Sequence, residues 1–205
     1  SNAVETGTMH IYGDDGSALE VQQVGGSRGS AFGYSIPPTG AYVFQTDAAP
    51  VNVNVGWVEV IPDGGTRAPV GSGIYQWSHN GVLVAESGIA ASEPTTHARI
   101  FVDKSSGHDS SVAIANPGTV PLNITWTAMK EDGSTPAGTT SVPLNLNGKG
   151  HIARFIGERI SGLPPAFRGV LDITGNTPFV PLTVRSLVNV RGDFLFTAFP
   201  VADMN

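Results

Sequence analysis

The stretch Val51-Asn-Val-Asn-Val-Gly-Trp-Val-Glu-Val60 decides the fold class of this chain. Apolar residues occupy its odd positions through Trp57, so they fall on one face of an extended strand. The alternation changes phase around Gly56, a residue type and position typical of a β-bulge. We therefore predict a half-buried β-strand here. The same period of two recurs along the chain, whereas a helical period is nearly absent.

Short strands bounded by glycine, proline, asparagine and aspartate account for most of the sequence. One short helix is expected at Ile156–Ile160, because Gly162 and Pro164 follow it as stop signals. Hairpin turns are expected where a residue that tolerates positive φ is followed by glycine. These dipeptides are Asp15-Gly16, Asn80-Gly81, Asp132-Gly133 and Arg191-Gly192. The other expected strands are Thr8–Tyr12, Leu19–Val24, Ala31–Ile36, Ala41–Thr46, Gly73–Ser78, Val82–Ser87, Ala98–Asp103, Ser111–Ala115, Leu122–Lys130, Thr139–Leu146, Gly150–Phe155, Gly169–Thr174, Val180–Val188 and Phe194–Val201.

The two halves of the chain resemble each other at an offset of about 110 residues, too long for a solenoid repeat and suitable for one small β domain. Gly13-Asp-Asp-Gly-Ser17 matches Lys130-Glu-Asp-Gly-Ser134, and Gly40-Ala-Tyr-Val-Phe44 matches Gly150-His-Ile-Ala-Arg-Phe155. We therefore predict an all-β fold made of two related antiparallel β-sandwich modules, Ig-like and in tandem. One sandwich built from two pseudo-symmetric halves is the alternative.

The modules are expected at residues 4–92 and 97–205, and residues 1–3 are interpreted as the remnant of an expression tag. The natural sequence is therefore expected to continue upstream of Val4. The first module has only Val4–Thr8 where the second has Ser111–Gly118, so we expect it to lack its opening strand. Such an open sheet edge invites pairing. We expect Ala98–Asp103 or another molecule to cover it.

Composition excludes several classes of function. The chain has 205 residues and a formal net charge of −6, with its few lysines scattered, which argues against nucleic-acid binding. It has no cysteine, which excludes disulfides, thiolate metal ligands and cysteine nucleophiles. No apolar run approaches the roughly 20 residues of a membrane-spanning helix, so no membrane insertion is expected. No cofactor is expected either.

Five segments of the second half form a pattern: Val112–Pro117, Lys130–Gly133, Gly150–Ile156, Gly162–Ile173 and Phe194–Val201. Together they resemble the uncharacterised β-sandwich repeat modules, of about 100 residues each, in long exported bacterial proteins. The resemblance extends more loosely to the first half. It implies a structural spacer or a binding appendage at an extracellular or cell-surface location, although no signal peptide is visible, and it supplies no catalytic residues.

Aromatic residues are the candidate binding residues. Trp57, Tyr75 and Trp77 lie in the first half, at places where the second half mostly has valine, leucine and phenylalanine. Tyr75 and Trp77 share one face of an expected strand. Aromatic rings on a sheet face stack on sugar rings or anchor protein interfaces. The alternative is that these rings fill the core of the first module.

Metal binding and catalysis have weaker support. The loop Asp103-Lys-Ser-Ser-Gly-His-Asp109 holds two carboxylates, Asp103 and Asp109, that are weak candidate calcium ligands. The spacing of an EF-hand is missing, and a solvated loop explains the composition equally well, so no metal is expected. None of the serines lies in a Gly-x-Ser-x-Gly or Ser-x-x-Lys motif. A catalytic triad would have to assemble in space.

We therefore expect a non-catalytic structural or adhesion-type β-sandwich module of an exported bacterial protein. It would act through contacts with a protein partner, or through self-association at an open sheet edge. The alternative is a carbohydrate-binding module that uses the first-half aromatics on a polysaccharide. An enzyme is the third hypothesis.

Overall fold

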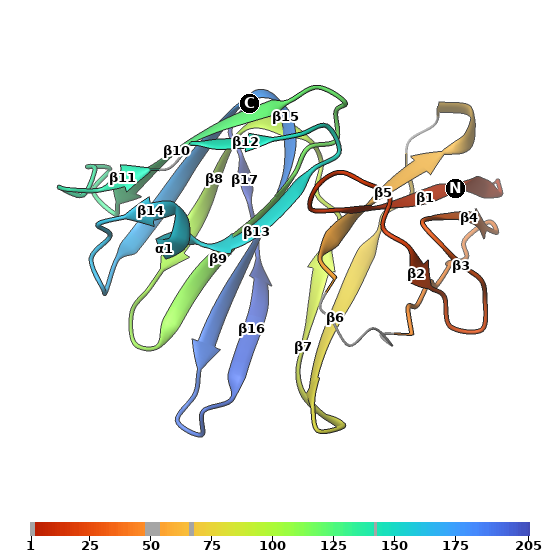
Figure 1. The fold of residues 1–205 in the computed structure, drawn as a ribbon, viewed down its shortest axis with the longest axis horizontal. Coiled ribbons are helices and arrows are strands. Elements are labelled where there is room, and N and C mark those ends of the chain that lie inside the picture. The colour runs from red at the N-terminus through yellow and green to blue at the C-terminus, as the bar shows by residue number, and fades with distance from the viewer. Residues whose placement is uncertain (1–2, 48–53, 66–67, 142) are drawn as a thin grey trace. The chain divides into compact units, whose positions relative to one another are not determined.

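The computed structural model describes residues 3–47, 54–65, 68–141 and 143–205 of the chain (Figure 1). The fold is all-β, with antiparallel sheets in a sandwich-like arrangement. The chain divides into unit 1 (Ser1–Val70 with Lys149–His151) and unit 2 (Gly71–Gly148 with Ile152–Asn205). The expected boundary near Ser92 lies inside unit 2, and the two-repeat interpretation stays a prediction. The expected strand that opens at Val51 lies partly outside the described residues.

Unit 1 contains a three-stranded antiparallel sheet in the order β4-β1-β5. The expected strand Ala41–Thr46 is wrong. In that segment only an isolated bridge forms, between Thr46 and Gln23. The strands of the sheet are β1 (Glu5–Gly13), β4 (Ala31–Ile36) and β5 (Gly56–Pro62); the smaller elements are β2 (Val21–Gln22), β3 (Arg28–Gly29) and the 3-10 turn η1 (Asp63–Gly65).

Aromatic rings form the core of unit 1. Phe32 and Tyr34 are buried, while the residues between and beside them on β4 are more exposed, as period-two alternation predicts. The ring of Phe44 packs on Phe32 with centroids 4.7 Å apart, and Tyr42 lies 6.4 Å from Tyr34. The segment expected as a strand therefore buries its aromatic residues against β4 without joining the sheet ladder.

Unit 2 contains a two-layered arrangement of strands. One layer has the order β12-β10-β15-β8-β17, and in the other β9 pairs with β13 and β15, while β16 pairs with β15. The first layer consists of β8 (Thr95–Asp103), β10 (Leu122–Lys130), β12 (Leu144–Leu146), β15 (Arg168–Val188) and β17 (Ala202–Asp203); the second adds β9 (His108–Ala115), β13 (His151–Phe155) and β16 (Phe194–Phe199).

The long strand β15 belongs to both layers. Two strands were expected here, but the chain runs on without a turn and only shifts register against β8 between Thr174 and Phe179. At this shift a Cβ on Gly175 would lie 2.8 Å from the ring of Phe179, so the backbone and the ring approach closely. The glycine thus allows the strand to bend from one layer into the other.

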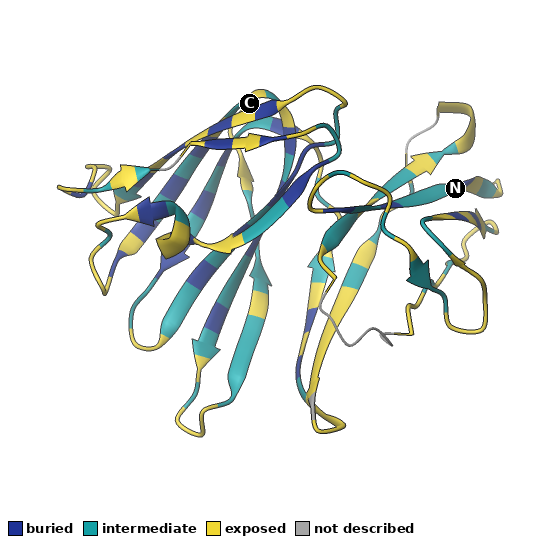
Figure 2. Cartoon of the chain, in the orientation of Figure 1, coloured by how far each residue is buried: buried dark blue, intermediate teal, exposed yellow. Residues whose placement is uncertain are grey.

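The core of unit 2 lies between these layers, where buried and exposed residues alternate along each strand (Figure 2). Trp126 on β10 is 1% exposed and is among the largest fully buried side chains. Burial of apolar area on this scale is the main stabilising contribution to such a fold. The other members include Ala98, Ile100, Val102, Val112, Ile114, Leu122, Ile124, Leu171, Ile173 and Phe179.

The remaining elements of unit 2 are short. The helix α1 (Ile156–Arg159) forms where one was expected, and β11 (Thr140–Ser141) pairs with β14 (Ile160–Ser161). The hairpin β6 (Ser72–His79) and β7 (Val82–Ala90) forms a two-stranded sheet of its own. β8 pairs with β15 and β17, so the expectation that Ala98–Asp103 covers an edge of the first module is wrong.

Candidate functional site

The β6–β7 hairpin carries two of the three candidate aromatic residues. Tyr75 lies opposite Ser87 and Trp77 lies opposite Ala85, which places both rings on the same face of the hairpin. The tight turn at its tip forms because Asn80 and Gly81 both adopt positive φ. The sequence therefore located this strand pair, its turn and the shared face of the two rings.

The side chains of this hairpin are unusually apolar for an exposed element. Ile74 is 70% exposed, Tyr75 52% and Trp77 40%. Val82 and Leu83, which open β7, are also exposed. Single exposed apolar residues are ordinary, but several on one hairpin favour an interaction site; Tyr75 and Trp77 lie on one face of it, and Ile74 lies on the other. The interpretation that Tyr75 and Trp77 fill a core does not fit these exposed fractions.

Contacts with β16 support the hairpin on one side. The ring of Trp77 meets Phe194 edge-on, with centroids 6.3 Å apart, and Phe194 in turn lies 6.1 Å from Phe196. The backbone N–H of Ala198 donates a hydrogen bond to Ser87 Oγ at 3.1 Å. The hairpin is thus fixed to the sandwich of unit 2, and Trp77 is held in one orientation.

Trp57 differs from this pair because it belongs to unit 1 and has internal partners. Its indole N–H donates to the backbone carbonyl of Lys149 at 2.8 Å, and its ring stacks on Tyr12 with centroids 5.3 Å apart. The Lys149 ammonium lies 5.9 Å from the Trp57 ring centre and bonds both carboxylate oxygens of Glu59. These contacts assign Trp57 a packing role in unit 1.

The weak metal candidates are engaged by protein cations. Asp103 accepts a 2.6 Å hydrogen bond from Arg185 Nη2, and Asp109 lies 3.2 Å from Lys104 Nζ. Burial opposes ionisation of Asp103, but bonds from Ser105 and Arg185 outweigh it and hold the pKa of that carboxyl well below its ordinary value. In the described part of the chain no group of three His, Asp or Glu side chains is arranged to hold a metal ion.

Two histidines lie beside carboxylates. His97 Nε2 lies 3.0 Å from Asp172 Oδ1, and His151 Nδ1 lies 2.8 Å from Asp14 Oδ1. Asp172 also accepts a 2.6 Å bond from Arg99, and the bonds from Arg99 and His97 lower its pKa despite burial. Among the hydrogen bonds of the described residues none joins a serine hydroxyl to either ring, so neither pair is extended into a triad geometry.

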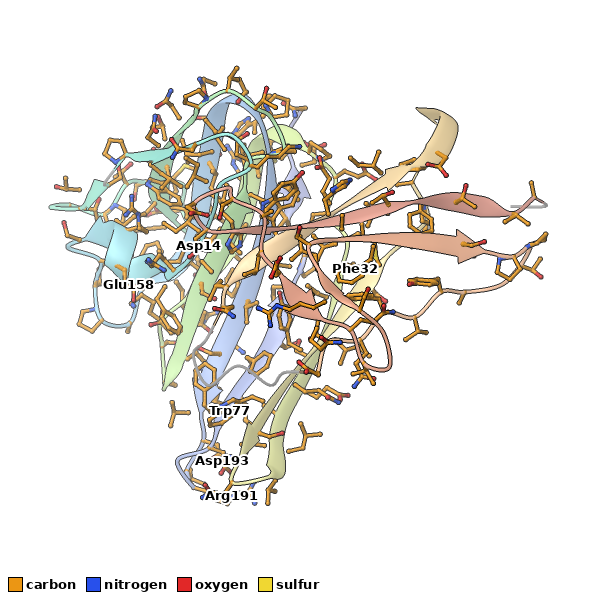
Figure 3. All side chains as sticks on the ribbon, turned by 45° about the vertical axis from the view of Figure 1, so that its right-hand side comes forward. Asp14, Phe32, Trp77, Glu158, Arg191 and Asp193 are labelled. Atoms are coloured by element: carbon orange, nitrogen blue, oxygen red, sulfur yellow. The ribbon has the colours of Figure 1, made fainter. Side chains whose placement is uncertain are left out.

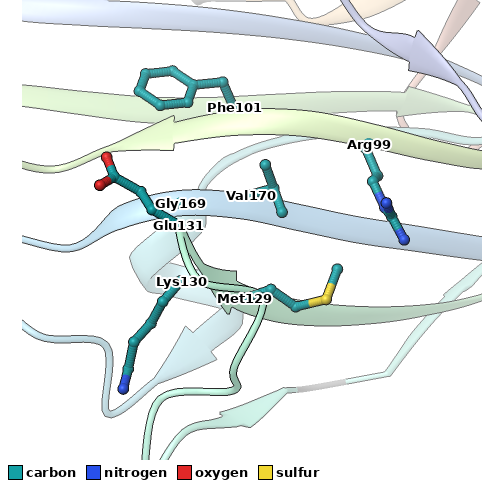
Figure 4. Close-up of a pocket in the computed structure, with 8 residues that line it drawn as sticks. Arg99, Phe101, Met129, Lys130, Glu131, Gly169 and Val170 are labelled. Atoms are coloured by element: carbon teal, nitrogen blue, oxygen red, sulfur yellow. The ribbon is translucent and has the colours of Figure 1, made fainter.

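A shallow hollow of about 440 Å³ lies on the face of unit 2 formed by β8, β10 and β15 (Figure 4). Phe101, Met129 and Val170 provide apolar side chains in it, with Lys130 and Glu131 at one end. Its walls are open, and it lacks the enclosure and convergent polar groups of a small-molecule site.

The Arg191-Gly192-Asp193 turn joins β15 to β16 beside Trp77 (Figure 3). Asn189 Oδ1 accepts hydrogen bonds from the backbone N–H groups of Arg191 and Asp193, and Gly192 adopts a φ of 83°. The Arg191 guanidinium lies 3.0 Å from the Asp193 carboxylate. The requirements of the turn therefore explain why Arg191, Gly192 and Asp193 occur together here, and no binding role is needed to explain them.

No protein-family model matches the chain, and neither the curated proteins nor the solved structures include a match to it. Among the described residues, no helix has the length and apolar character needed to cross a membrane.

Proposed function

We propose that this chain is a non-catalytic, structural or adhesion-type β-sandwich module that acts through protein contacts. The observation that carries the proposal is the β6–β7 hairpin, where Ile74, Tyr75 and Trp77 are exposed on a supported element. Tyrosine and tryptophan are enriched at the centres of protein interfaces, because they bury large areas at low entropic cost. Placement in an exported bacterial protein, at the cell surface or outside the cell, is part of the proposal and rests on the resemblance of the second half.

Polysaccharide binding is the second candidate, and the same two rings favour it. Tyr75 and Trp77 are two residues apart on one strand, so their side chains project from the same face. Rings presented in this way offer flat surfaces to successive sugar units. However, the Trp77 ring already packs against Phe194, which reduces the ring surface available to a sugar. Ile74 and Leu83 also expose aliphatic surface on the same hairpin, and sugar binding does not require it.

Site-specific photo-crosslinking in the natural full-length protein, in its own cells, tests the proposal. A benzophenone amino acid replaces Tyr75, and the matched control replaces Val120, an exposed loop residue of unit 2 that lies outside the hairpin. We expect adducts with protein from position 75 and few or none from position 120. Absence of protein adducts from position 75 contradicts the proposal. Retention of the chain on insoluble polysaccharides, lost in the Tyr75→Ser/Trp77→Ser variant, would favour the second candidate instead.

A further inference from the structure

Among the described residues, the backbone groups along the outer edge of β6 have no hydrogen-bond partner. The backbone N–H of Ala91 donates to Gly71 O at 3.0 Å, which fixes Gly71 and Ala91 as a hydrogen-bonded pair. Hydrogen-bonded and non-hydrogen-bonded pairs alternate along an antiparallel ladder. With the observed register, Ser72, Ile74 and Gln76 therefore direct their N–H and C=O groups away from β7. Within the described residues β6 pairs with no strand other than β7.

The first part of this edge, from Ser72 to Trp77, carries none of the features that usually prevent edge pairing. Natural edge strands are protected by lysine, proline, inward charges or bulges. β6 (Ser72–His79) contains no lysine, arginine, aspartate, glutamate or proline. Its register with β7 shifts only beyond Trp77, so its first part is regular. The one charged residue opposite this part, Glu86, is bonded by Gln76 at 2.7 Å.

The sequence of the edge is complementary to itself. When two copies of β6 run antiparallel about a two-fold axis at Ile74, all three residues with outward backbone groups form hydrogen-bonded pairs. Ser72 then lies opposite Gln76 of the second copy, and Ile74 lies opposite Ile74. On the other face, Tyr75 lies opposite Gly73 and Trp77 lies opposite Gly71. Each aromatic residue of one copy thus meets a glycine of the other.

Of these two glycines, Gly71 is not required by the fold of a single chain. Gly71 and Gly73 have no positive φ, and a Cβ on Gly71 would meet only Ala91 Cβ at 3.7 Å, an ordinary contact. A Cβ on Gly73 would lie 3.1 Å from the side chain of Ile89, closer than an ordinary contact, so Ile89 on β7 already packs against this glycine within the chain. Glycine within a strand often marks a place where another group approaches the backbone closely.

Unit 1 already uses the same pairing within the chain. Gly7 on β1 lies directly opposite Tyr34 on β4. A Cβ on Gly7 would lie 2.5 Å from Tyr34 Oη and 2.7 Å from Cε1, so the tyrosine lies across the glycine. An aromatic ring that covers a cross-strand glycine is a known way to stabilise a sheet at that position.

From these observations we infer that a second copy of this chain occupies the β6 edge, pairing antiparallel about Ile74 to give a continuous sheet across the dimer. The inference rests on the proposed function, because it names the partner of the same hairpin. The interface is at the small end of specific interfaces, and the net charge of −6 opposes association. We therefore expect a dissociation constant in the micromolar range that falls as salt is added.

Sedimentation equilibrium from about 5 µM to about 500 µM measures the association. The Ile74→Lys variant places two like charges opposite each other at the axis, and Gly71→Val occupies the space of the Trp77 ring. The matched control is Val82→Lys, which adds the same charge to the same hairpin on β7. We expect both edge variants to raise the dissociation constant about tenfold or more, and the control to change it by less than about twofold.

Amide exchange followed by NMR tests the register in the same samples. The Ser72, Ile74 and Gln76 amides are expected to exchange rapidly in the monomer and slowly in the dimer, whereas Gly73 and Tyr75 are protected in both. A chain that remains monomeric across the whole range overturns the inference. So does a dimer that Ile74→Lys and Val82→Lys weaken equally. A monomer with protected Ser72, Ile74 and Gln76 amides also overturns it, because another part of the chain would then cover the edge.

The two proposals fail separately. A strictly monomeric chain that still forms adducts with another protein from position 75 overturns self-pairing and supports the proposed function. A chain that gives no protein adduct from that position, with itself or with any other protein, overturns both.

Discussion

Replacement of Asp103 by asparagine tests the ion pair that joins the two layers of unit 2. Asp103 ends β8 in one layer, and Arg185 lies on the part of β15 that pairs with β9 in the other. The Asp103 side chain is only 6% exposed, and it accepts a 2.6 Å bond from Arg185 Nη2. Asparagine is nearly isosteric and can still accept the bonds from Ser105. The substitution therefore removes the charge and leaves the shape.

The magnitude follows from the burial of the two partners. Removal of one partner from a fully buried pair costs about 3–5 kcal/mol, because the other charge remains buried without compensation. Arg185 is 28% exposed, so water compensates part of that loss. We therefore expect Asp103→Asn to lower the free energy of unfolding of unit 2 by about 2 kcal/mol at pH 7.

The pH dependence of the stability difference distinguishes loss of the ion pair from loss of packing, because a packing defect does not depend on pH. Because the folded-state pKa of Asp103 is lowered, its contribution is complete above the unfolded-state pKa of about 3.9 and disappears as the pH falls toward the folded-state value. The difference between wild type and Asp103→Asn should therefore be constant between about pH 7 and pH 5 and shrink below about pH 4.

Urea denaturation followed by Trp126 fluorescence measures these differences, in a background where Trp57 and Trp77 are phenylalanine so that only the core of unit 2 reports. The matched control is Asp109→Asn, whose side chain is 34% exposed and pairs with Lys104. We expect it to cost less than about 1 kcal/mol. A loss below about 0.5 kcal/mol for Asp103→Asn, or a loss that stays the same at pH 3, would refute the reasoning.

Three further predictions concern stability. Burial and the nearby charges of Asp63 and Glu5 raise the pKa of Tyr34, and its hydroxyl is buried without a hydrogen-bond partner among the described residues. Tyr34→Phe should therefore leave the thermal stability of unit 1 unchanged or increase its free energy of unfolding by up to about 1 kcal/mol, and a loss would contradict this. The buried amide of Asn116 donates to the carbonyls of Val120 and Asn147, so Asn116→Ala should cost about 2–3 kcal/mol in urea denaturation. Tyr75→Ser, at an exposed site, should change calorimetric stability by less than about 0.5 kcal/mol, so that any loss of crosslinking or association in this variant reports on binding.

Strand positions could be predicted from the sequence where alternation coincides with one-sided burial. Ala31–Ile36 and Leu122–Lys130 have the expected bounds, because each has one face in a core and the other toward solvent. Ala41–Thr46 alternates as well, but Phe44 satisfies its burial against Phe32 through a ring contact that needs no ladder. Periodicity reports which side chains are buried, and in this segment it does not report which backbone groups pair.

Long-range partners could not be predicted. The loop that begins at Asp103 has the composition of a cluster of oxygen ligands, but its decisive contact is the hydrogen bond from Arg185, 82 residues away in the sequence. Gly175 and Pro178 are typical turn residues and predict an interruption within β15, although here they accompany a bend of a continuous strand between layers. In each case the outcome depends on which strands become neighbours, and local sequence does not contain that information.

The aromatic residues of β6 and the two glycines at its start, Gly71 before the strand and Gly73 within it, are best explained together. Glycine within a strand costs roughly 0.5–1 kcal/mol relative to alanine. Ile89 packs over Gly73 within the chain, whereas a Cβ on Gly71, which directly precedes β6, would meet only Ala91 Cβ at an ordinary distance. Tyr75 and Trp77 are 52% and 40% exposed, and aromatic residues exposed beside an open strand edge carry a risk of aggregation. If the hairpin faced only solvent, the glycines and the exposed aromatic rings would each need a separate explanation. Pairing with β6 of a second copy explains both features at once, because it places each ring opposite a glycine and pairs the backbone groups of Ser72, Ile74 and Gln76.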